Sequence, residues 1–189
     1  MKYLKYLLGL ILLLVIIFFA KGLLTPSIYY ESEVTVDKPA NESWAVMSDE
    51  ANLPKWIKGF KRTEHISGDV NQIGEISKVY VEDQGQEMIM EQTIIDVRKN
   101  ELLAMSFKAD FMDMEYDMLF DEKDGKTTIK TKSTTVGNGI FAKSLGSFMT
   151  SSMKTMEDAN LESLKKLIEE NTKEYFQVSK IDTTLEMTK

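Results

Sequence analysis

The sequence has no cysteine and a single histidine, His65, among its 189 residues. The lack of cysteine excludes disulfides, thiolate nucleophiles, iron–sulfur clusters and cysteine-ligated zinc. Because His65 has no second imidazole or thiolate with which to hold zinc, the sequence predicts no metal site. We expect this histidine on the surface or at the edge of a sheet rather than in a catalytic role.

Basic residues are too few for a nucleic-acid-binding protein. The chain has 23 lysines and arginines against 30 aspartates and glutamates, which gives a formal net charge of −7 at pH 7. Nucleic-acid-binding domains normally carry a basic surface, so we predict no nucleic-acid partner. Beyond the apolar N-terminus, about 150 residues remain, the usual length of one domain. A domain of that length folds without a metal or disulfide.

The one long apolar stretch lies at the N-terminus. Lys2 and Lys5 precede an uncharged run at 6–20, and Lys21 follows it. As a helix at about 1.5 Å per residue, this run is about 22 Å long, shorter than a hydrocarbon layer of about 30 Å. If the helix continues through residues 22–24 and the Lys21 ammonium reaches the membrane interface, the segment is long enough to span the membrane. We therefore predict a transmembrane anchor at residues 1–25.

A cleaved secretory signal has similar basic and apolar regions and is the alternative to an anchor. Signal cleavage normally requires small residues in an A-x-A-like pattern, which Phe18, Phe19 and Ala20 match poorly. The terminal amine, Lys2 and Lys5 outweigh the positive charge that follows the run, which favours a cytoplasmic N-terminus. The sequence thus predicts a single-pass protein of the cell membrane with an extracytoplasmic domain.

Alternating apolar and polar residues predict a run of strands after the anchor. The predicted strands are 28–36, 60–66, 75–82, 87–97, 102–108, 112–120 and 127–136. Short turns separate most of them, and such short connections favour antiparallel neighbours. The strand at 112–120 is the most regular, because methionine and aromatic residues alternate with acidic ones. One face of the sheet is therefore expected in the core and the other in water.

Two short helices, at 40–47 and 49–56, are predicted between the first two strands. A long amphipathic helix is predicted from Gly139 to about Tyr175, because apolar residues recur at spacings of three and four. Its apolar positions are Phe141, Leu145, Phe148, Met149, Met153, Met156, Leu164, Leu167 and Ile168. Its polar face is predicted to carry Lys154, Glu157, Glu162, Lys165, Lys166, Glu169 and Glu170. The predicted domain covers 26–176, and a polar, loosely ordered tail covers 177–189.

This order of elements resembles the START / polyketide cyclase-like superfamily, also called SRPBCC or helix-grip proteins. The segments that carry the resemblance are 34–44 (VTVDKPANESW), 52–56 (NLPKW), 90–97, 102–107 and 139–168. The anchor is similar to that of a membrane-tethered bacterial subgroup. The resemblance implies an α+β helix-grip fold, in which a curved antiparallel sheet of about seven strands wraps the C-terminal helix and two short helices follow strand 1. It also implies an apolar cavity between sheet and helix, which binds lipids or hormones in some members and cyclises polyketides in others.

Methionines are the main candidates for ligand contact, because most of the twelve lie on elements that would wall this cavity. Thioether side chains are flexible and polarizable, which suits varied apolar ligands, although they can equally fill gaps in a core. Tyr116 adds a hydroxyl as a polar handle, unless it simply bonds the backbone. The predicted pocket is lined by Trp56, Met105, Phe107, Met112, Met114, Tyr116, Met118, Met149, Met153 and Met156.

No catalytic constellation is evident. The acidic residues at 110–117 alternate along an extended strand, which is typical of a solvated face and unlike a calcium-binding loop. The glycines at 137–146 lack the strand–helix unit of a dinucleotide site. The serines and threonines at 131–135 and 147–152 lack a histidine partner for a nucleophilic triad. We therefore predict no catalytic residue and no cofactor.

The sequence thus predicts a membrane-tethered carrier or sensor that binds a lipid-like or other apolar small molecule between sheet and C-terminal helix. One alternative is a polyketide cyclase or dehydratase, which needs a pocket group with a shifted pKa, and Tyr116 is the only candidate. The other alternative is a protein-interaction domain with a filled core. Binding is expected rather than catalysis.

Overall fold

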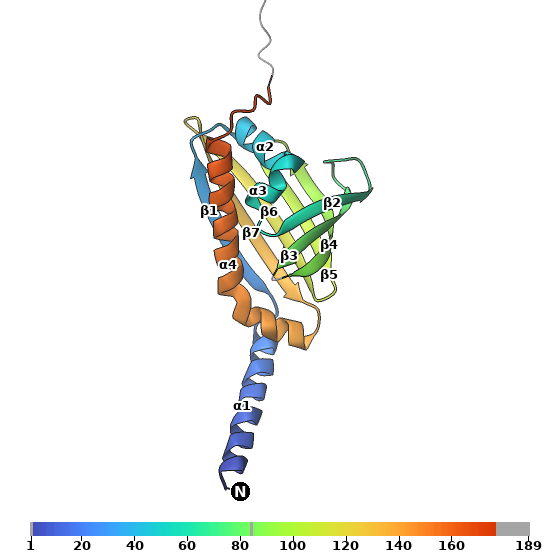
Figure 1. Ribbon diagram of the computed structural model, residues 1–189, viewed down its shortest axis with the longest axis vertical. Helices are drawn as coiled ribbons and strands as arrows, with labels where there is room; N and C mark the ends of the chain where they lie inside the picture. The colour runs from blue at the N-terminus through green and yellow to red at the C-terminus, as the bar shows by residue number, and fades with distance from the viewer. Residues whose placement is uncertain (1, 84, 177–189) are drawn as a thin grey trace, which may run out of the picture.

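The computed structural model describes residues 2–83 and 85–176. It begins with helix α1 (Lys2–Leu24) and ends with helix α4 (Ile140–Glu169), and a seven-stranded sheet lies between them (Figure 1). The strands are β1 (Ile28–Val36), β2 (Phe60–Ser67), β3 (Ile76–Asp83), β4 (Gln86–Arg98), β5 (Leu102–Ala109), β6 (Met112–Lys123) and β7 (Lys126–Gly137). Helix α2 (Ala40–Ser48), a 3₁₀ turn η1 (Glu50–Asn52) and helix α3 (Leu53–Trp56) follow β1. The predicted fold class is confirmed.

The sheet is a meander with one strand added at its end. Its order is β1-β7-β6-β5-β4-β3-β2, and every neighbouring pair is antiparallel. The β6–β7 turn shows how the sequence sets the register. Asp124 and Gly125 both have positive φ, 55° and 75°, as a two-residue type I′ turn requires, and aspartate followed by glycine is a favoured pair for it.

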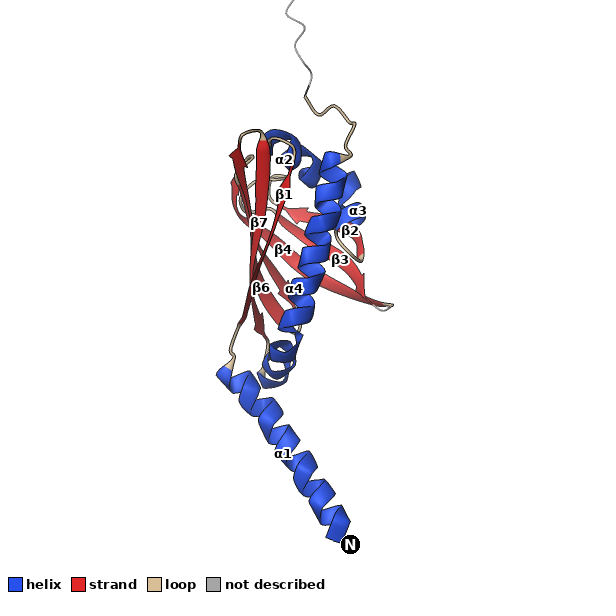
Figure 2. Cartoon of the chain, turned by 90° about the vertical axis from the view of Figure 1, so that its left-hand side faces the viewer, coloured by secondary structure: helices blue, strands red, loops and turns tan. Residues whose placement is uncertain are grey.

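Helix α4 lies along β1 and β7 on the inner side of the curved sheet, and α2 and α3 close the end farthest from α1 (Figures 1 and 2). The core is densest at this closed end. Leu161, Leu164 and Ile168 of α4 are at most 1 % exposed, and they share one apolar cluster with Trp44 and Phe120. Burying such side chains stabilises a fold by about 1.5–3 kcal/mol each, so the closed end holds much of the stability.

The first half of α4 differs from the prediction. Its apolar residues Phe141, Leu145, Phe148 and Met149 are 45–63 % exposed, so they do not cover the sheet. The predicted polar residue Glu157 is only 8 % exposed. Glu157 is buried because of its spacing along the helix. It precedes Leu161 by four residues and Leu164 by seven, which places it on the same face of the helix as these leucines.

The end of α4 also differs from the prediction, which extended the helix to about Tyr175. The helix ends at Glu169, and the chain then turns toward α2 and α3. The Tyr175 hydroxyl donates to Asp49 Oδ2 at 2.8 Å, and Lys173 Nζ lies 2.6 Å from the same atom. A helix that continued past Glu169 could not make these contacts, so they favour the observed end of α4. The tail predicted at 177–189 lies outside the described residues.

Helix α1 is long and apolar enough, over Tyr3–Leu24, for a membrane span or a signal sequence. Only its last turns contact the domain, and most of its side chains are exposed. Three residues, 25–27, connect it to β1. The domain therefore begins directly where the apolar helix stops.

Candidate functional site

The inner face of the sheet combines two kinds of side chain. Pairing register places Met114 opposite Phe107 and Thr135, and Tyr116 opposite Met105 and Ser133. Residues directly opposite one another on neighbouring strands project to the same face. The β5–β6 part of the inner face is therefore apolar and rich in thioethers, whereas the β7–β1 part carries hydroxyls.

A buried phenol–carboxyl pair joins the sheet to α4 at the border between these two parts. The Tyr116 hydroxyl donates to Glu157 Oε1 at 2.7 Å, and the two residues are 9 % and 8 % exposed. Burial raises the pKa of the Tyr116 phenol well above its ordinary value, and the adjacent Glu157 charge adds to this effect. Burial likewise raises the pKa of the Glu157 carboxyl, whereas the neighbouring Tyr116 and Thr131 hydroxyls act in the opposite direction.

Tyr30 and three buried hydroxyls lie on the same face of the sheet as Tyr116, on β1 and β7. Tyr30 of β1 lies opposite Ser133 of β7. Burial raises the pKa of the Tyr30 phenol, the Ser133 hydroxyl acts in the opposite direction, and the Glu157 charge adds a smaller rise. The hydroxyl oxygens of Ser32, Ser133 and Thr135 are buried, and none has a described protein partner in good hydrogen-bonding geometry, although Ser133 approaches the Tyr30 phenol and Ser32 approaches the Asp158 carboxyl. Buried polar atoms normally have partners, and leaving one unpaired costs about 1–3 kcal/mol. These hydroxyls are therefore suited to the polar end of a ligand.

The structure brings most of the predicted pocket residues to the inner face, but not all of them. Tyr116 and Met118 are buried there, and the predicted residues that are half-buried are Met105, Phe107, Met112, Met114 and Met153. Trp56, the last residue of α3, is buried in the core, and its indole nitrogen has no partner among the described residues. Met149 and Met156 are 45 % and 46 % exposed and do not face the interior.

Sequence reasoning missed Glu157, Tyr30 and the orphan hydroxyls of Ser32, Ser133 and Thr135. The sequence contained a signal for Glu157 in its spacing to the apolar residues of α4. Thr131 and Ser133 alternate with Lys130 and Lys132, which is the pattern of one buried and one solvent-exposed strand face. The sequence singles out the hydroxyls at 131–135 only as possible nucleophiles, and it predicts no triad for them.

The histidine and the acidic strand residues singled out in the sequence lie outside this interior. His65 is exposed on the edge strand β2, with Nδ1 3.3 Å from Glu75 Oε1, so its predicted edge position is confirmed. Asp113 and Glu115 are exposed on the outer face of β6, as expected. Among residues 2–83 and 85–176, no group of three or more histidine, aspartate or glutamate side chains is placed to hold a metal.

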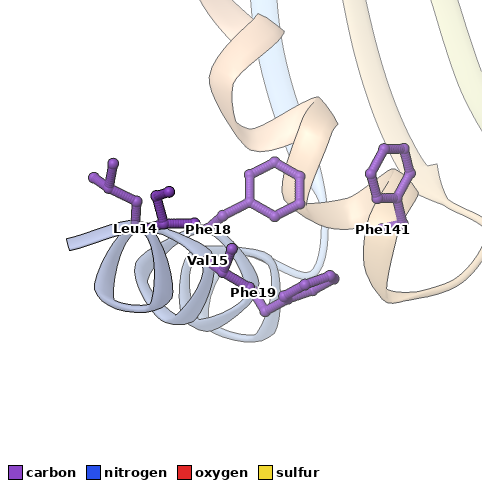
Figure 3. Close-up of a pocket in the computed structure, with 6 residues that line it drawn as sticks. Leu14, Val15, Phe18, Phe19 and Phe141 are labelled. Carbon is purple, nitrogen blue, oxygen red and sulfur yellow. The ribbon is translucent and has the colours of Figure 1, made fainter. Parts of the chain in front are cut away.

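Two open hollows in the structure lie elsewhere than the expected cavity. One, of about 370 Å³, is apolar and lined by Ile11, Leu14, Val15, Phe18 and Phe19 of α1 and Phe141 of α4 (Figure 3). The other, of about 400 Å³, is polar and lies where α4 passes the edge strand β1. Both lysines of its lining are already in ion pairs, Lys130 with Glu31 and Lys154 with Asp158.

Solved structures with the same architecture confirm the fold. The Zhui aromatase/cyclase from Streptomyces sp. R1128 is 14 % identical, with a TM-score of 0.64, and the match covers 76 % of this chain and 94 % of that chain. Ara h 8.0201 is 16 % identical, with a TM-score of 0.54, and the match covers 73 % of this chain and 98 % of that chain. The protein of unknown function SA2116 from Staphylococcus aureus is 13 % identical, with a TM-score of 0.58, and the match covers 76 % of this chain and 95 % of that chain. Comparison with curated proteins gave no match.

The family profile described as "Polyketide cyclase / dehydrase and lipid transport" matches residues 28–169. This match runs from the first residue of β1 to the last residue of α4 and covers most of the chain. The resemblance to the polyketide cyclase-like helix-grip superfamily is thereby confirmed. The chain belongs to the polyketide cyclase / dehydrase and lipid transport family.

Proposed function

We propose that the domain binds an apolar small molecule or lipid between the inner face of β5–β6 and α4, as a carrier or sensor. The observation that carries this proposal is the apolar, half-buried surface of Met105, Phe107, Met112 and Met114 beside the buried Tyr116 hydroxyl. Small-molecule sites are mostly apolar, with a few polar groups that fix the orientation of the ligand. Burying apolar surface of this kind is worth about 25 cal/mol per Å².

The polar groups restrict the class of ligand. The carboxyl of Glu157 would repel an anionic head group, because the two charges would meet in a poorly solvated interior. The orphan hydroxyls of Ser133 and Thr135 can both donate and accept. A neutral end such as a hydroxyl or carbonyl fits these partners best. The proposed ligand therefore has an extended apolar body and one uncharged polar end.

Replacing Met153 with tryptophan should remove most of the bound ligand. Met153 precedes Glu157 by one helical turn and is half-buried, and overpacking such a site costs about 1–3 kcal/mol, or roughly tenfold in affinity. The full chain is purified in mild detergent, and native mass spectrometry identifies any co-purified apolar molecule and its occupancy. Met156→Trp is the matched control, because that methionine is 46 % exposed on the same helix.

The two variants together decide the binding proposal. We expect occupancy to fall about tenfold in Met153→Trp and to remain near wild type in Met156→Trp. Equal occupancy in both variants would place any bound molecule outside the interior. A wild-type chain that carries no apolar molecule and takes none from a lipid panel would contradict the proposal itself.

We also infer that α1 is a retained membrane span, with the domain on the extracytoplasmic side. Its last turns are packed against α4, which a segment removed by cleavage has no reason to do: Phe18 stacks on Phe148 with ring centroids 5.9 Å apart. Mass spectrometry of the membrane fraction should give the full 189-residue chain. A soluble chain that starts near residue 21 would show instead that α1 is a signal sequence.

A second candidate function is cyclase or dehydrase chemistry. The observation that favours it is the Tyr116–Glu157 pair, because a buried carboxyl with a raised pKa is a suitable general acid or base. The family description is compatible with either function. The two differ in outcome: a carrier releases its ligand unchanged, whereas an enzyme converts a polyketide-like chain and loses turnover in Glu157→Gln.

A further inference from the structure

The first turns of α4, residues 140–149, have their polar side inward and their apolar side outward. Ser144 and Ser147 are buried, at 0 % and 9 % exposure, whereas Phe141 and Phe148 are 63 % and 53 % exposed. In a helix that covers a sheet in water, the apolar stripe faces the protein. An exposed apolar face of this size instead indicates an apolar surrounding.

These turns lie beside the last turns of α1 (Figures 1 and 2). Phe18 stacks on Phe148 with planes 3° apart and lies 5.7 Å from the ring centroid of Phe141, and Figure 3 shows it pointing from α1 toward α4. The Lys21 ammonium lies 4.2 Å from the Phe148 ring centroid. The exposed face of α4 therefore continues the exposed apolar surface of α1.

The contact with Phe18 fixes the depth of α4 relative to a membrane that α1 spans. Phe18 belongs to the uncharged run at 6–20 and precedes Lys21 by three residues, or about 4.5 Å along the helix. When the Lys21 ammonium lies at the interface, Phe18 lies below it in the acyl-chain layer. Phe141 and Phe148 touch Phe18 and must lie at a similar depth.

We propose that residues 140–149 of α4 are embedded in the leaflet nearest the domain, as an interfacial helix beside α1. The occupant of their exposed apolar face is the acyl-chain layer of the bilayer. Helical backbone satisfies its own hydrogen bonds there, and an apolar face with aromatic residues is typical of interfacial helices. This inference rests on the membrane-spanning role of α1 proposed above.

Embedding these turns has a consequence for the interior. The same helix carries Met153 and Glu157, one and two turns beyond the embedded segment. The half-buried methionines of the inner face then lie close to the lipid surface. On this placement, an apolar ligand that enters between the sheet and α4 at this end would come from the lipid surface rather than from water.

The absence of cysteine makes single spin labels a clean test in the full chain. Labels are placed at Leu145→Cys and Met149→Cys on the exposed face, in phospholipid nanodiscs. Ile95→Cys is the control, because Ile95 is a comparably exposed apolar residue on β4, and Leu13→Cys reports on α1. Collision of each label with oxygen, which concentrates in the acyl layer, is compared with collision with a water-soluble nickel chelate.

We expect the labels at 145, 149 and 13 to collide more with oxygen and the label at 95 to collide more with nickel. Nickel-dominated collision at 145 and 149, with oxygen-dominated collision at 13, would overturn the inference and leave the anchor intact. Nickel-dominated collision at 13 as well would overturn both. Dipolar broadening between labels at 145 would show that a second copy covers this face, which also overturns the inference. Ligand occupancy, measured separately, reports on the binding proposal alone.

Discussion

Replacing Tyr116 with phenylalanine is expected to lower the free energy of unfolding by about 1.5–3 kcal/mol at neutral pH. The variant keeps the ring in place but removes the hydroxyl that donates to Glu157 Oε1 at 2.7 Å. The buried carboxylate then loses this donor and keeps only the Thr131 hydroxyl of β7, and a hydrogen bond to a charged group is worth more than one between neutral groups. Denaturant unfolding of the full chain in detergent measures the loss.

The loss should depend on pH in a defined direction. Because burial raises the pKa of the Glu157 carboxyl in the folded state, its stabilising contribution is full below the ordinary value of 4.5 and is lost as pH rises through the folded pKa. Removing the Tyr116 hydroxyl, which favours the ionised carboxyl, raises that pKa further. The deficit of Tyr116→Phe should therefore be smaller at pH 4 than at pH 7.

Two control variants separate the buried bond from a general effect of losing a hydroxyl. Tyr29→Phe removes an exposed phenol from the edge strand β1 and should change the free energy of unfolding by less than about 0.5 kcal/mol. In a Glu157→Gln background, Tyr116→Phe should lower the free energy of unfolding by a smaller amount. That loss should not depend on pH, since the amide is neutral. An equal cost in both backgrounds, flat with pH, would mean that the Tyr116–Glu157 bond does not couple the sheet to α4.

Sequence reasoning predicted the sheet well because the alternation of buried and wet residues is a direct record of its two faces. The strand predicted at 112–120 is observed as β6 (Met112–Lys123), longer by three residues. The difference has a simple cause. The tight turn at Asp124 and Gly125 lets both strands continue pairing up to Lys123 and Lys126, beyond the end of the apolar pattern.

The same reasoning failed on the first half of α4, and the failure has a physical origin. A stripe of phenylalanine, leucine and methionine indicates an apolar neighbour but not which one, because a protein core and a lipid layer select the same residues. Leu145 and Met149 were therefore expected on the sheet and are exposed. Small polar residues such as Ser144 and Ser147 are usually expected on the solvent side of a helix. They are buried here because small side chains allow close packing between helices.

Replacing Gly22 with leucine is expected to separate α1 from the first turns of α4. A Cβ atom at position 22 would lie 2.2 Å from Ser144 Oγ and 2.6 Å from the backbone nitrogen of the same residue. Backbone cannot move aside as a flexible side chain does, so the two helices must shift and the Phe18–Phe148 stack must open. Overpacking of this kind costs about 1–3 kcal/mol.

Amide hydrogen exchange of residues 140–149, in the full chain in nanodiscs, measures that separation. The expected cost corresponds to exchange roughly 5 to 150 times faster in Gly22→Leu than in the wild type. Gly9→Leu is the matched control, because it makes the same change in the same helix at a position with no atom within 4 Å of the added Cβ. Unchanged exchange in both variants would mean that α1 only tethers the domain. Faster exchange confined to Gly22→Leu would show that the α1–α4 contact holds the first turns of α4 in place.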